Sequence, residues 1–478
     1  MYRQKIKGNG RHKSFHERWM HHFLDILVLD NALNHHDHIE FMDAKTFFIY
    51  FFNILAFVLY IALVGVNIWP IIGLYWTRPD WWGGNTSIKA TEYAAGGALV
   101  GMVAMSIHLD ILRKKMKITH RTTRICQCVG ICGGIVLLSA CLPYFIIPAQ
   151  VGENARAEFA RTWSVDWETR VHRPANGPWL DSPYSFVQEY LPLSYSKDAF
   201  TFQQNIEFFN NGNDSFKCDA WIPVVPGPNP VQIFIHGGGW GGFDKNFIIG
   251  YQLEYFAAAG YTVFSVDYGS KGGTGVQGEV NRTRQYSIPE ICANLGKFSD
   301  WLAQPAQVTA YNMNISRCFI TGLSAGGHLS ALMGMARTKV GAWNPAVHVR
   351  GAIDFYGIMN IRQWAMVSQT SLYNGKLFNS SILTDYSIVD RYSPITYAET
   401  PSLAGGDIVP LLIFHGDADT VVSVTQGRDM NDMCDSRLLK CVYIEIPRGA
   451  HVFESDNNAG PSQITLWAME RFMQLCAA

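Results

Sequence analysis

Six short apolar runs rich in β-branched residues recur along the second half of the chain, and stretches of helical character separate them. Runs of this kind are typical of parallel strands that are buried on both faces. The pattern predicts an α/β domain over residues 201–478, built on a doubly wound, mostly parallel sheet. The expected strands are Val231–Ile235, Thr262–Val266, Arg317–Thr321, Val349–Phe355, Leu411–His415 and Val442–Ile446.

Three apolar stretches precede this domain and predict a helical transmembrane region over residues 47–148. Phe47–Trp76 and Ile125–Pro148 carry no charged residue and are long enough to cross a bilayer. The middle stretch, Tyr93–Leu112, has His108 and Asp110 near one end, so both a crossing and an interfacial position stay open. The expected helices are about 47–76, 93–112 and 125–148, and a basic arm, residues 1–46, precedes them.

Basic residues indicate the orientation of this region. The connection after the middle stretch is strongly basic, and short basic loops normally stay on the cytoplasmic side, as we expect for residues 1–46. If the middle stretch crosses, everything after residue 148 is lumenal or extracellular, in the endomembrane system or at the plasma membrane. All five N-x-[ST] patterns then lie on that side, which predicts a glycoprotein. The basic residues of the loop are Arg113, Lys114, Lys115, Lys117, Arg121 and Arg124, and the patterns begin at Asn85, Asn213, Asn281, Asn314 and Asn379.

Composition and the remaining segments narrow the choice of partners. A net charge of −1 supplies no field that would concentrate nucleic acid, so we expect no nucleic-acid partner. Seven of the fifteen histidines lie in the first 38 residues, but that arm lacks cysteine, and we expect no metal site there. Residues 149–200 contain four prolines and no sustained period, which predicts an irregular linker. Six cysteines follow it, and Cys434 with Cys441 would close a short loop in an oxidising compartment.

The segment Gly322–Gly326 has the sequence G-L-S-A-G and lies between an expected strand and the helix-capable run His328–Met335. A nucleophile elbow requires this strand-to-helix context, and its strained backbone favours small neighbours. The motif predicts Ser324 as a nucleophile. Taken alone it is moderately specific, because glycine and serine are abundant in ordinary loops.

A second glycine-rich segment, His236-Gly237-Gly238-Gly239-Trp240, directly follows the strand Val231–Ile235. A turn of this HGGG type usually supplies half of an oxyanion hole, and the residue after the nucleophile supplies the other half. The prediction assigns these donors to the backbone N–H groups of Gly238, Gly239 and Ala325. Without the elbow, a plain strand-to-helix turn would be the better interpretation.

Two further strand ends supply an acid and a base. The strand Leu411–His415 leads into Asp417 and Asp419, and we favour Asp419 because Asp417 is better placed to shape the turn. His451 follows the last expected strand. Ser324, Asp419 and His451 therefore occur in the order nucleophile, acid, base, which predicts a triad that needs neither a metal nor an organic cofactor.

The motifs resemble those of α/β-hydrolases in the branch of hormone-sensitive lipases, acetyl-esterases and carboxylesterases. The resemblance begins near Phe202 and rests on HGGGW, GLSAGGHLSALM, Tyr392-Ser393-Pro394-Ile395-Thr396, HGDADTVV and GAH. It implies the same catalytic triad, and it implies that residues 360–407 contribute to a cap or acyl pocket. The membrane region has no counterpart in that resemblance.

These features together predict a membrane-anchored serine hydrolase that cleaves a carboxylic ester, with a small-molecule or lipid ester as substrate. An amidase or acyltransferase would use the same acyl-enzyme, and a membrane-complex subunit would keep the fold as a scaffold. The complete set of motifs argues against the scaffold. We expect Asp354, Asp267 and His236 to be buried and hydrogen-bonded rather than catalytic. The sequence leaves substrate identity and oligomeric state open.

Overall fold

A computed structural model describes residues 146–477 except 175–176, 190, 192, 247–249, 272–281, 283, 368–376 and 379–385. The basic arm and the three expected spans therefore lie outside the described residues, apart from the last three residues of the third span. None of the helices within the described part is long and apolar enough to cross a membrane.

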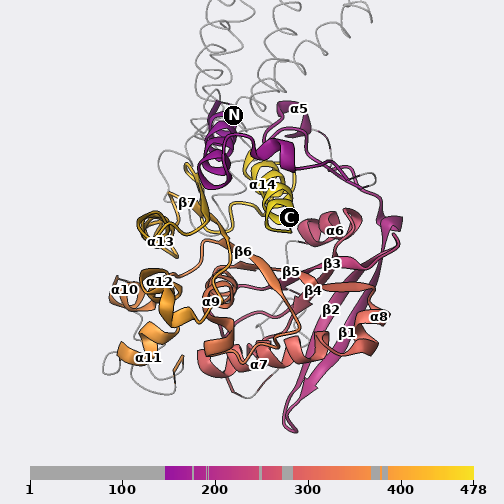
Figure 1. Cartoon of the computed structure of the whole chain (residues 1–478), viewed down its shortest axis with the longest axis vertical. Helices are drawn as coiled ribbons and strands as arrows, with labels where there is room; N and C mark the ends of the chain where they lie inside the picture. The colour runs from indigo at the N-terminus through magenta and orange to yellow at the C-terminus, as the bar shows by residue number, and fades with distance from the viewer. Residues whose placement is uncertain are drawn as a thin grey trace, which may run out of the picture. The chain divides into compact units, whose positions relative to one another are not determined.

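An eight-stranded sheet organises the described part of the chain (Figure 1), with the strand order β1-β2-β4-β3-β5-β6-β7-β8. β1 and β2 pair antiparallel, β2 pairs antiparallel with β4, and the strands from β4 to β8 are parallel. All six strands expected from the sequence are present, so the predicted doubly wound sheet is confirmed. The strands are β1 (Phe200–Asn210), β2 (Ser215–Pro223), β3 (Asn229–Ile235), β4 (Thr262–Val266), β5 (Met313–Leu323), β6 (Val349–Phe355), β7 (Leu411–Gly416) and β8 (Cys441–Ile446).

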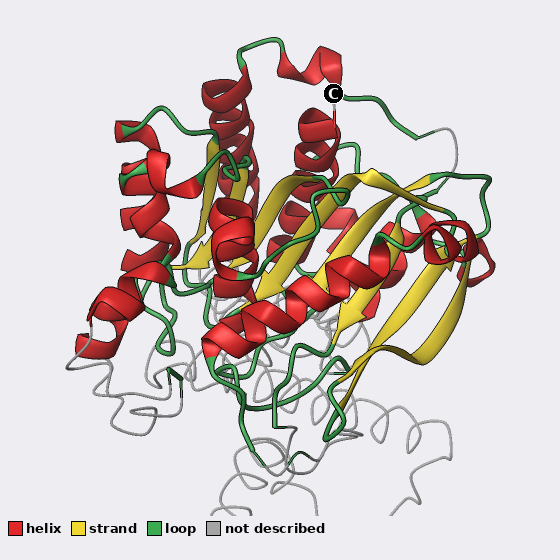
Figure 2. Ribbon diagram, turned by 60° about the horizontal axis from the view of Figure 1, so that its bottom comes forward, coloured by secondary structure: helices red, strands yellow, loops and turns green. Residues whose placement is uncertain are grey.

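Both faces of the sheet are covered, because successive residues of the central strands point into two separate cores. In β7, Leu411 and Ile413 belong to one core, and Leu412 and Phe414 belong to the other. The first core packs against α7 (Ile288–Leu302), α9 (Ala325–Val340), α12 (Pro394–Glu399) and α13 (Thr425–Ser436). The second packs against α6 (Gly250–Ala258), α14 (Gly460–Ala477) and a helix at residues 146–163. Figure 2 shows helices on both sides of the sheet.

Short elements complete the described part. They are η1 (Trp167–Arg170), α5 (Phe186–Glu189), η2 (Lys197–Ala199), α8 (Pro305–Ala310), α10 (Ile361–Val367), α11 (Tyr386–Arg391) and η4 (Pro401–Ala404). Three of them, α10, α11 and η4, lie with α12 in the segment 360–407 that the resemblance connects with a cap.

The start of the described chain differs from the linker expected over residues 149–200. Residues 146–163 are helical, and their apolar side chains recur every four residues at Val151, Ala155, Phe159 and Trp163. This spacing forms one apolar stripe, which buries against the second core. Sequence reasoning missed this amphipathic spacing.

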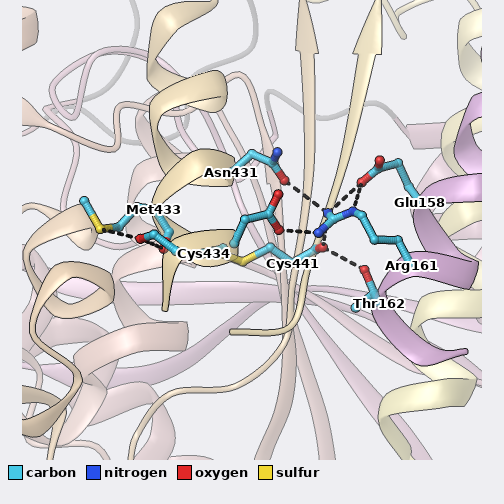
Figure 3. Close-up of a disulfide and its surroundings, with 9 residues drawn as sticks. Glu158, Arg161, Thr162, Asn431, Met433, Cys434 and Cys441 are labelled. Atoms are coloured by element: carbon cyan, nitrogen blue, oxygen red, sulfur yellow. Dashed lines mark hydrogen bonds and ion pairs between the residues drawn. A yellow bond between two sulfur atoms is a disulfide. The ribbon is translucent and has the colours of Figure 1, made fainter. Parts of the chain in front are cut away.

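The cysteines also differ in use. Cys434 and Cys441 form a disulfide with a sulfur–sulfur distance of 1.97 Å, closing the short loop considered from the sequence (Figure 3). Cys218, Cys292 and Cys318 are buried free thiols, and burial raises the pKa of each. They behave as small apolar core residues.

Candidate active site

Ser324 lies between the last residue of β5 and the first residue of α9, as the elbow motif predicts. Its backbone has φ 56° and ψ −117°, a strained conformation for a residue with a side chain. Two hydrogen bonds fix it: the Ser324 N–H donates to the Phe355 carbonyl at 2.8 Å, and the His328 N–H donates to the Ser324 carbonyl at 2.9 Å. The serine is thus held in a strained turn at the carboxyl end of the central strand.

Close backbone contacts explain the glycines around Ser324. A Cβ on Gly322 would lie 2.0 Å from the Gly326 carbonyl oxygen, and a Cβ on Gly326 would lie 2.0 Å from the carbonyl oxygen of Ile235. Neither gap admits a methyl group. Glycine at position 326 therefore lets the end of β3 approach the elbow directly.

The HGGG turn lies beside the elbow. A Cβ on Gly237 would lie 3.4 Å from the Cβ of Ser324. Gly238 and Gly239 have φ of 110° and 60°, and the Gly242 N–H donates to the Gly238 carbonyl at 2.7 Å. The glycine-rich turn therefore begins next to Ser324, and its first glycine puts no side chain between the two segments.

The predicted oxyanion donors have a shared property. Within the described part of the chain, the backbone N–H groups of Gly238, Gly239 and Ala325 donate to no other residue. Ala325 is the first residue of α9, where N–H groups have no acceptor inside the helix. None of these three N–H groups is therefore committed to an acceptor within the described part of the chain.

His451 and Asp419 form a buried pair. The Nδ1 atom of His451 lies 2.7 Å from Oδ2 of Asp419, and the two side chains are 4% and 0% exposed. The other oxygen of Asp419 accepts the N–H groups of Val421 and Val422 at 2.8 and 2.9 Å. The carboxylate is therefore oriented by the turn after β7 and in turn orients the imidazole.

The structure distinguishes the two aspartates that competed for this position. Asp417 is exposed and accepts the backbone N–H of Arg448, whereas Asp419 contacts His451. Asp417 shapes the turn, as its position next to the strand predicts.

Tyr356 and Glu454 stand behind His451, and sequence reasoning missed both. The ring of Tyr356 lies 4.5 Å from the imidazole between centroids, and its hydroxyl donates to the Glu454 carboxylate. Glu454 is fully buried, and burial raises its pKa to about 8. A tyrosine after a strand and a glutamate in a loop carry no local signal of this contact.

Phe355 and Tyr356 also connect the Ser324 elbow with His451. The Phe355 carbonyl accepts the N–H of Ser324, and the next residue, Tyr356, packs against His451. The end of β6 thus brings the elbow and the imidazole to the same edge of the sheet.

His328 ties three predicted segments together. The indole N–H of Trp240 donates to its Nδ1 at 3.1 Å, and its Nε2 lies 2.7 Å from the Tyr392 carbonyl. Burial lowers the His328 pKa to about 4, so the ring is neutral near pH 7, with Nε2–H as the donor. The signal for this contact was in the motifs, since each residue lies in a segment that carries the family resemblance.

The three polar residues expected to be buried and hydrogen-bonded are buried, and each makes at least one hydrogen bond. Asp267 receives two hydrogen bonds from Arg282, at 2.9 and 2.6 Å. Asp354 accepts the Gly357 N–H at 2.9 Å, and His236 stacks on a tyrosine ring at 4.2 Å between centroids. In addition, the described residues contain no group of three or more His, Cys, Asp or Glu side chains arranged to hold a metal ion. The histidine-rich arm lies outside them.

Comparisons with known proteins relate this chain to esterases. The BD-FAE family model matches residues 219–433, which include Ser324 and Asp419 and end before His451. The probable carboxylic ester hydrolase LipM of Mycobacterium tuberculosis is 23% identical over 331 residues, covering 68% of this chain and 69% of LipM. The esterase LipC of the same organism is 25% identical over 245 residues, covering 49% of this chain and 56% of LipC.

Among solved structures, a truncated carbohydrate esterase from gut microbiota aligns with a TM-score of 0.44 and 21% identity, covering 58% of this chain and 99% of its own. Esterase B from Lactobacillus rhamnosus aligns with a TM-score of 0.46 and 14% identity, covering 68% and 96%. The two mycobacterial relatives alone show that the sequence is similar to a probable carboxylic ester hydrolase and to an esterase.

Proposed function

We propose that this chain is a serine carboxylesterase in which Ser324, His451 and Asp419 form the catalytic triad. The observation that carries the proposal is the buried 2.7 Å contact between His451 and Asp419, at the same edge of the sheet as the strained Ser324. Carboxylic ester hydrolysis as the reaction class is supported by both named mycobacterial relatives.

The arrangement suits acyl transfer through a covalent intermediate. His451 takes the Ser324 hydroxyl proton as the oxygen attacks the ester carbonyl, and Asp419 stabilises the imidazolium. The N–H groups of Gly238, Gly239 and Ala325 bind the oxyanion, and one such donor is typically worth about 3 kcal/mol. The alcohol leaves with a proton from His451, and water then hydrolyses the acyl-enzyme with His451 as base.

A fluorophosphonate probe tests this assignment on the full chain. We expect covalent labelling that Ser324→Ala abolishes, while Ser316→Ala leaves labelling unchanged, because Ser316 lies near the opposite end of β5. Hydrolysis of a short-chain ester should fall with the labelling. Labelling that persists in Ser324→Ala contradicts the assignment, and absence of labelling in the unaltered chain favours a scaffold.

Membrane anchoring and a lumenal or extracellular catalytic domain form the second part of the proposal. Support comes from the uncharged sequence of residues 125–148, from the Cys434–Cys441 disulfide, and from Asn213, which is exposed in the turn between β1 and β2. Disulfides persist in oxidising compartments. Asn314 is half-buried in β5, so Asn213 is the better glycosylation acceptor of the two.

Glycosidase treatment of the full chain tests the orientation. We expect a mobility shift that Asn213→Gln reduces and Asn314→Gln leaves unchanged. A chain that shows no shift, with a catalytic domain that protease digests in intact vesicles from the cytoplasmic side, contradicts the lumenal assignment.

A further inference from the structure

The helix at residues 146–163 lies alongside α14 and runs in the same direction. A Cβ on Gly460 would lie 2.7 Å from Pro148, the ring of Phe159 lies 5.8 Å from that of Trp467, and the ring of Trp163 lies 5.8 Å from that of Phe472. Both helices therefore begin at the same end. Pro148 is also the last residue of the third apolar stretch, so the stretch ends on the catalytic domain itself.

The other end of this helix is fastened at the start of β8. Thr162 and Arg161 both donate to the Cys441 carbonyl, at 2.8 and 3.1 Å, and Arg161 forms an ion pair with Asp435 beside the disulfide (Figure 3). From residue 162 back to residue 148 the helix rises about 21 Å. β8 spans about 17 Å. Residue 148 therefore reaches the carboxyl end of β8, the edge that carries His451.

Hydrogen bonds connect this corner to the active site. Ser462, in the first turn of α14, donates to the Glu454 carbonyl at 3.1 Å, and the Glu454 side chain accepts from Tyr356, which packs on His451. The C-terminus lies at the opposite edge, in the upper part of Figure 2.

An exposed apolar group lies at the same corner. Ser185 and Gln463 exchange hydrogen bonds of 2.8 and 3.2 Å, which fix the start of α5 beside the first turn of α14. The next residues expose large apolar side chains: Phe186 is 49%, Val187 62% and Leu191 53% exposed. We call these three residues the α5 patch.

We propose that the active-site edge faces the bilayer, with the α5 patch in contact with lipid, and that the substrate is an ester of an amphiphile resident in that bilayer. This inference rests on the proposed esterase and its anchor. A span that ends at residue 148 places the membrane surface at the corner shared by the α5 patch and the loop of His451. An apolar patch at that level gains free energy from contact with the interface. A lipid ester then reaches Ser324 without crossing bulk water.

Lipid contact is tested by photo-crosslinking of the full chain in lipid nanodiscs, with a photoreactive phenylalanine analogue at Val187 or at Val224. The two valines are 62% and 59% exposed, but Val224 follows β2, whose end pairs near the start of β4, at the opposite edge. We expect lipid adducts from position 187 at a yield about fivefold above position 224. Equal yields overturn the inference and leave esterase and anchor intact.

Substrate class is tested with the double variant Phe186→Ser and Val187→Ser against Val224→Ser. We expect the rate on a bilayer-resident long-chain ester to fall about tenfold in the double variant, while hydrolysis of a water-soluble short-chain ester stays unchanged. Val224→Ser should alter neither rate. Equal loss on both esters, or loss on neither, overturns the lipid assignment. A chain that fails to float with vesicles overturns the anchor and this inference together, but not Ser324 labelling.

Discussion

The two halves of the active site are built by different means. The elbow and the HGGG turn are fixed by backbone contacts too close for any side chain, such as the 2.0 Å gap beside Gly326. The imidazole half is fixed by side chains: Asp419 orients His451, and Tyr356 and Glu454 support it from behind. The elbow and the HGGG turn therefore depend on the absence of side chains, whereas the position of the imidazole depends on hydrogen bonds and charge. We expect substitutions in the first part to lower stability and substitutions in the second part to lower activity.

The largest expected effect is a loss of activity when the contact between Asp419 and His451 is altered. Asp419→Asn keeps the shape of the side chain but removes the charge that holds the His451 tautomer, so we expect kcat to fall about 10⁴-fold. The folded structure should survive, because the substitution preserves side-chain volume. Kinetics on a short-chain ester and thermal unfolding measure both quantities.

Asp417→Asn is the matched control for that variant. Asp417 is exposed, lies two residues away and makes a turn contact with Arg448. We expect kcat to change by less than about threefold. Equal losses in the two variants would mean that Asp419 is not the acid of the triad.

The next largest expected effect is a loss of stability when a side chain is introduced at the nucleophile elbow. A Cβ introduced by Gly326→Ala would lie 2.0 Å from the Ile235 carbonyl oxygen, so β3 and the elbow must separate. We expect the free energy of unfolding to fall by about 3 kcal/mol or more, with activity lost in parallel. Gly212→Ala is the control, because an added Cβ there would have nothing within 4 Å of it, while the φ of 90° still strains the backbone. It should cost about 1 kcal/mol. Similar costs for the two variants would show that space does not fix the elbow.

This contrast explains how much could be predicted from sequence. Glycines and small residues beside Ser324 are a local signal, because a close backbone approach excludes larger residues at those positions. The six parallel strands were also visible, because each is a mostly buried and mostly apolar run, although β6 contains Arg350 and Asp354 and β8 contains Glu445. β1 was missed because its exposed positions break that pattern, and Phe208 is the only buried residue of the described strand. β2 was missed because Lys217 and Asp219 interrupt its apolar residues.

The supports of His451 could not be predicted, because they depend on contacts across long sequence separations. Tyr356 and Glu454 are 98 residues apart, and neither lies in a recognisable motif. The helix at residues 146–163 was missed although its apolar residues have helical spacing in the sequence, whereas its packing against α14 is a contact across more than 300 residues that no local pattern shows. Local patterns determine the elements, but the partners of each element come from the assembled sheet.

A smaller loss of activity is expected where a side-chain hydrogen bond supports the HGGG turn. Trp240→Phe removes the indole N–H that His328 accepts at 3.1 Å, which loosens the turn that carries Gly238 and Gly239. We expect kcat to fall about tenfold with KM little changed, because the oxyanion donors act mainly in the transition state.

Trp343→Phe is the control for this variant. Trp343 is equally buried, and its indole N–H donates to the Val347 carbonyl at 2.9 Å, far along the chain from the HGGG turn. Both variants should lose about 1 kcal/mol of stability, but Trp343→Phe should keep its kcat. A similar kcat for both variants would limit the Trp240 contact to stability.

The smallest expected effect concerns the protonation of Glu454, which lies behind His451. Burial raises the pKa of Glu454 from 4.5 to about 8, so the folded protein holds this proton more tightly than the unfolded chain does. The stability that the protonated group contributes is full below pH 4.5 and is lost as pH rises through about 8. Glu454→Gln, which mimics the protonated form, should make the free energy of unfolding less dependent on pH in that range, as urea titrations at pH 5 and 8 would measure.

Glu470→Gln is the control for Glu454→Gln, because it shows whether the effect on kcat depends on the contact with Tyr356 or only on the burial of a carboxyl group. Burial also raises the pKa of Glu470 to about 8, but Glu470 contacts Tyr255 and Arg471 on the second core rather than the support of His451. Both variants should flatten the dependence of stability on pH, because the sign of the shift is the same. Only Glu454→Gln should change kcat above pH 8, by about twofold, since ionised Glu454 places a negative charge behind the imidazole. If Glu470→Gln changes kcat equally, the imidazole half is sensitive to core charge in general, and the Tyr356–Glu454 contact has no special part in it.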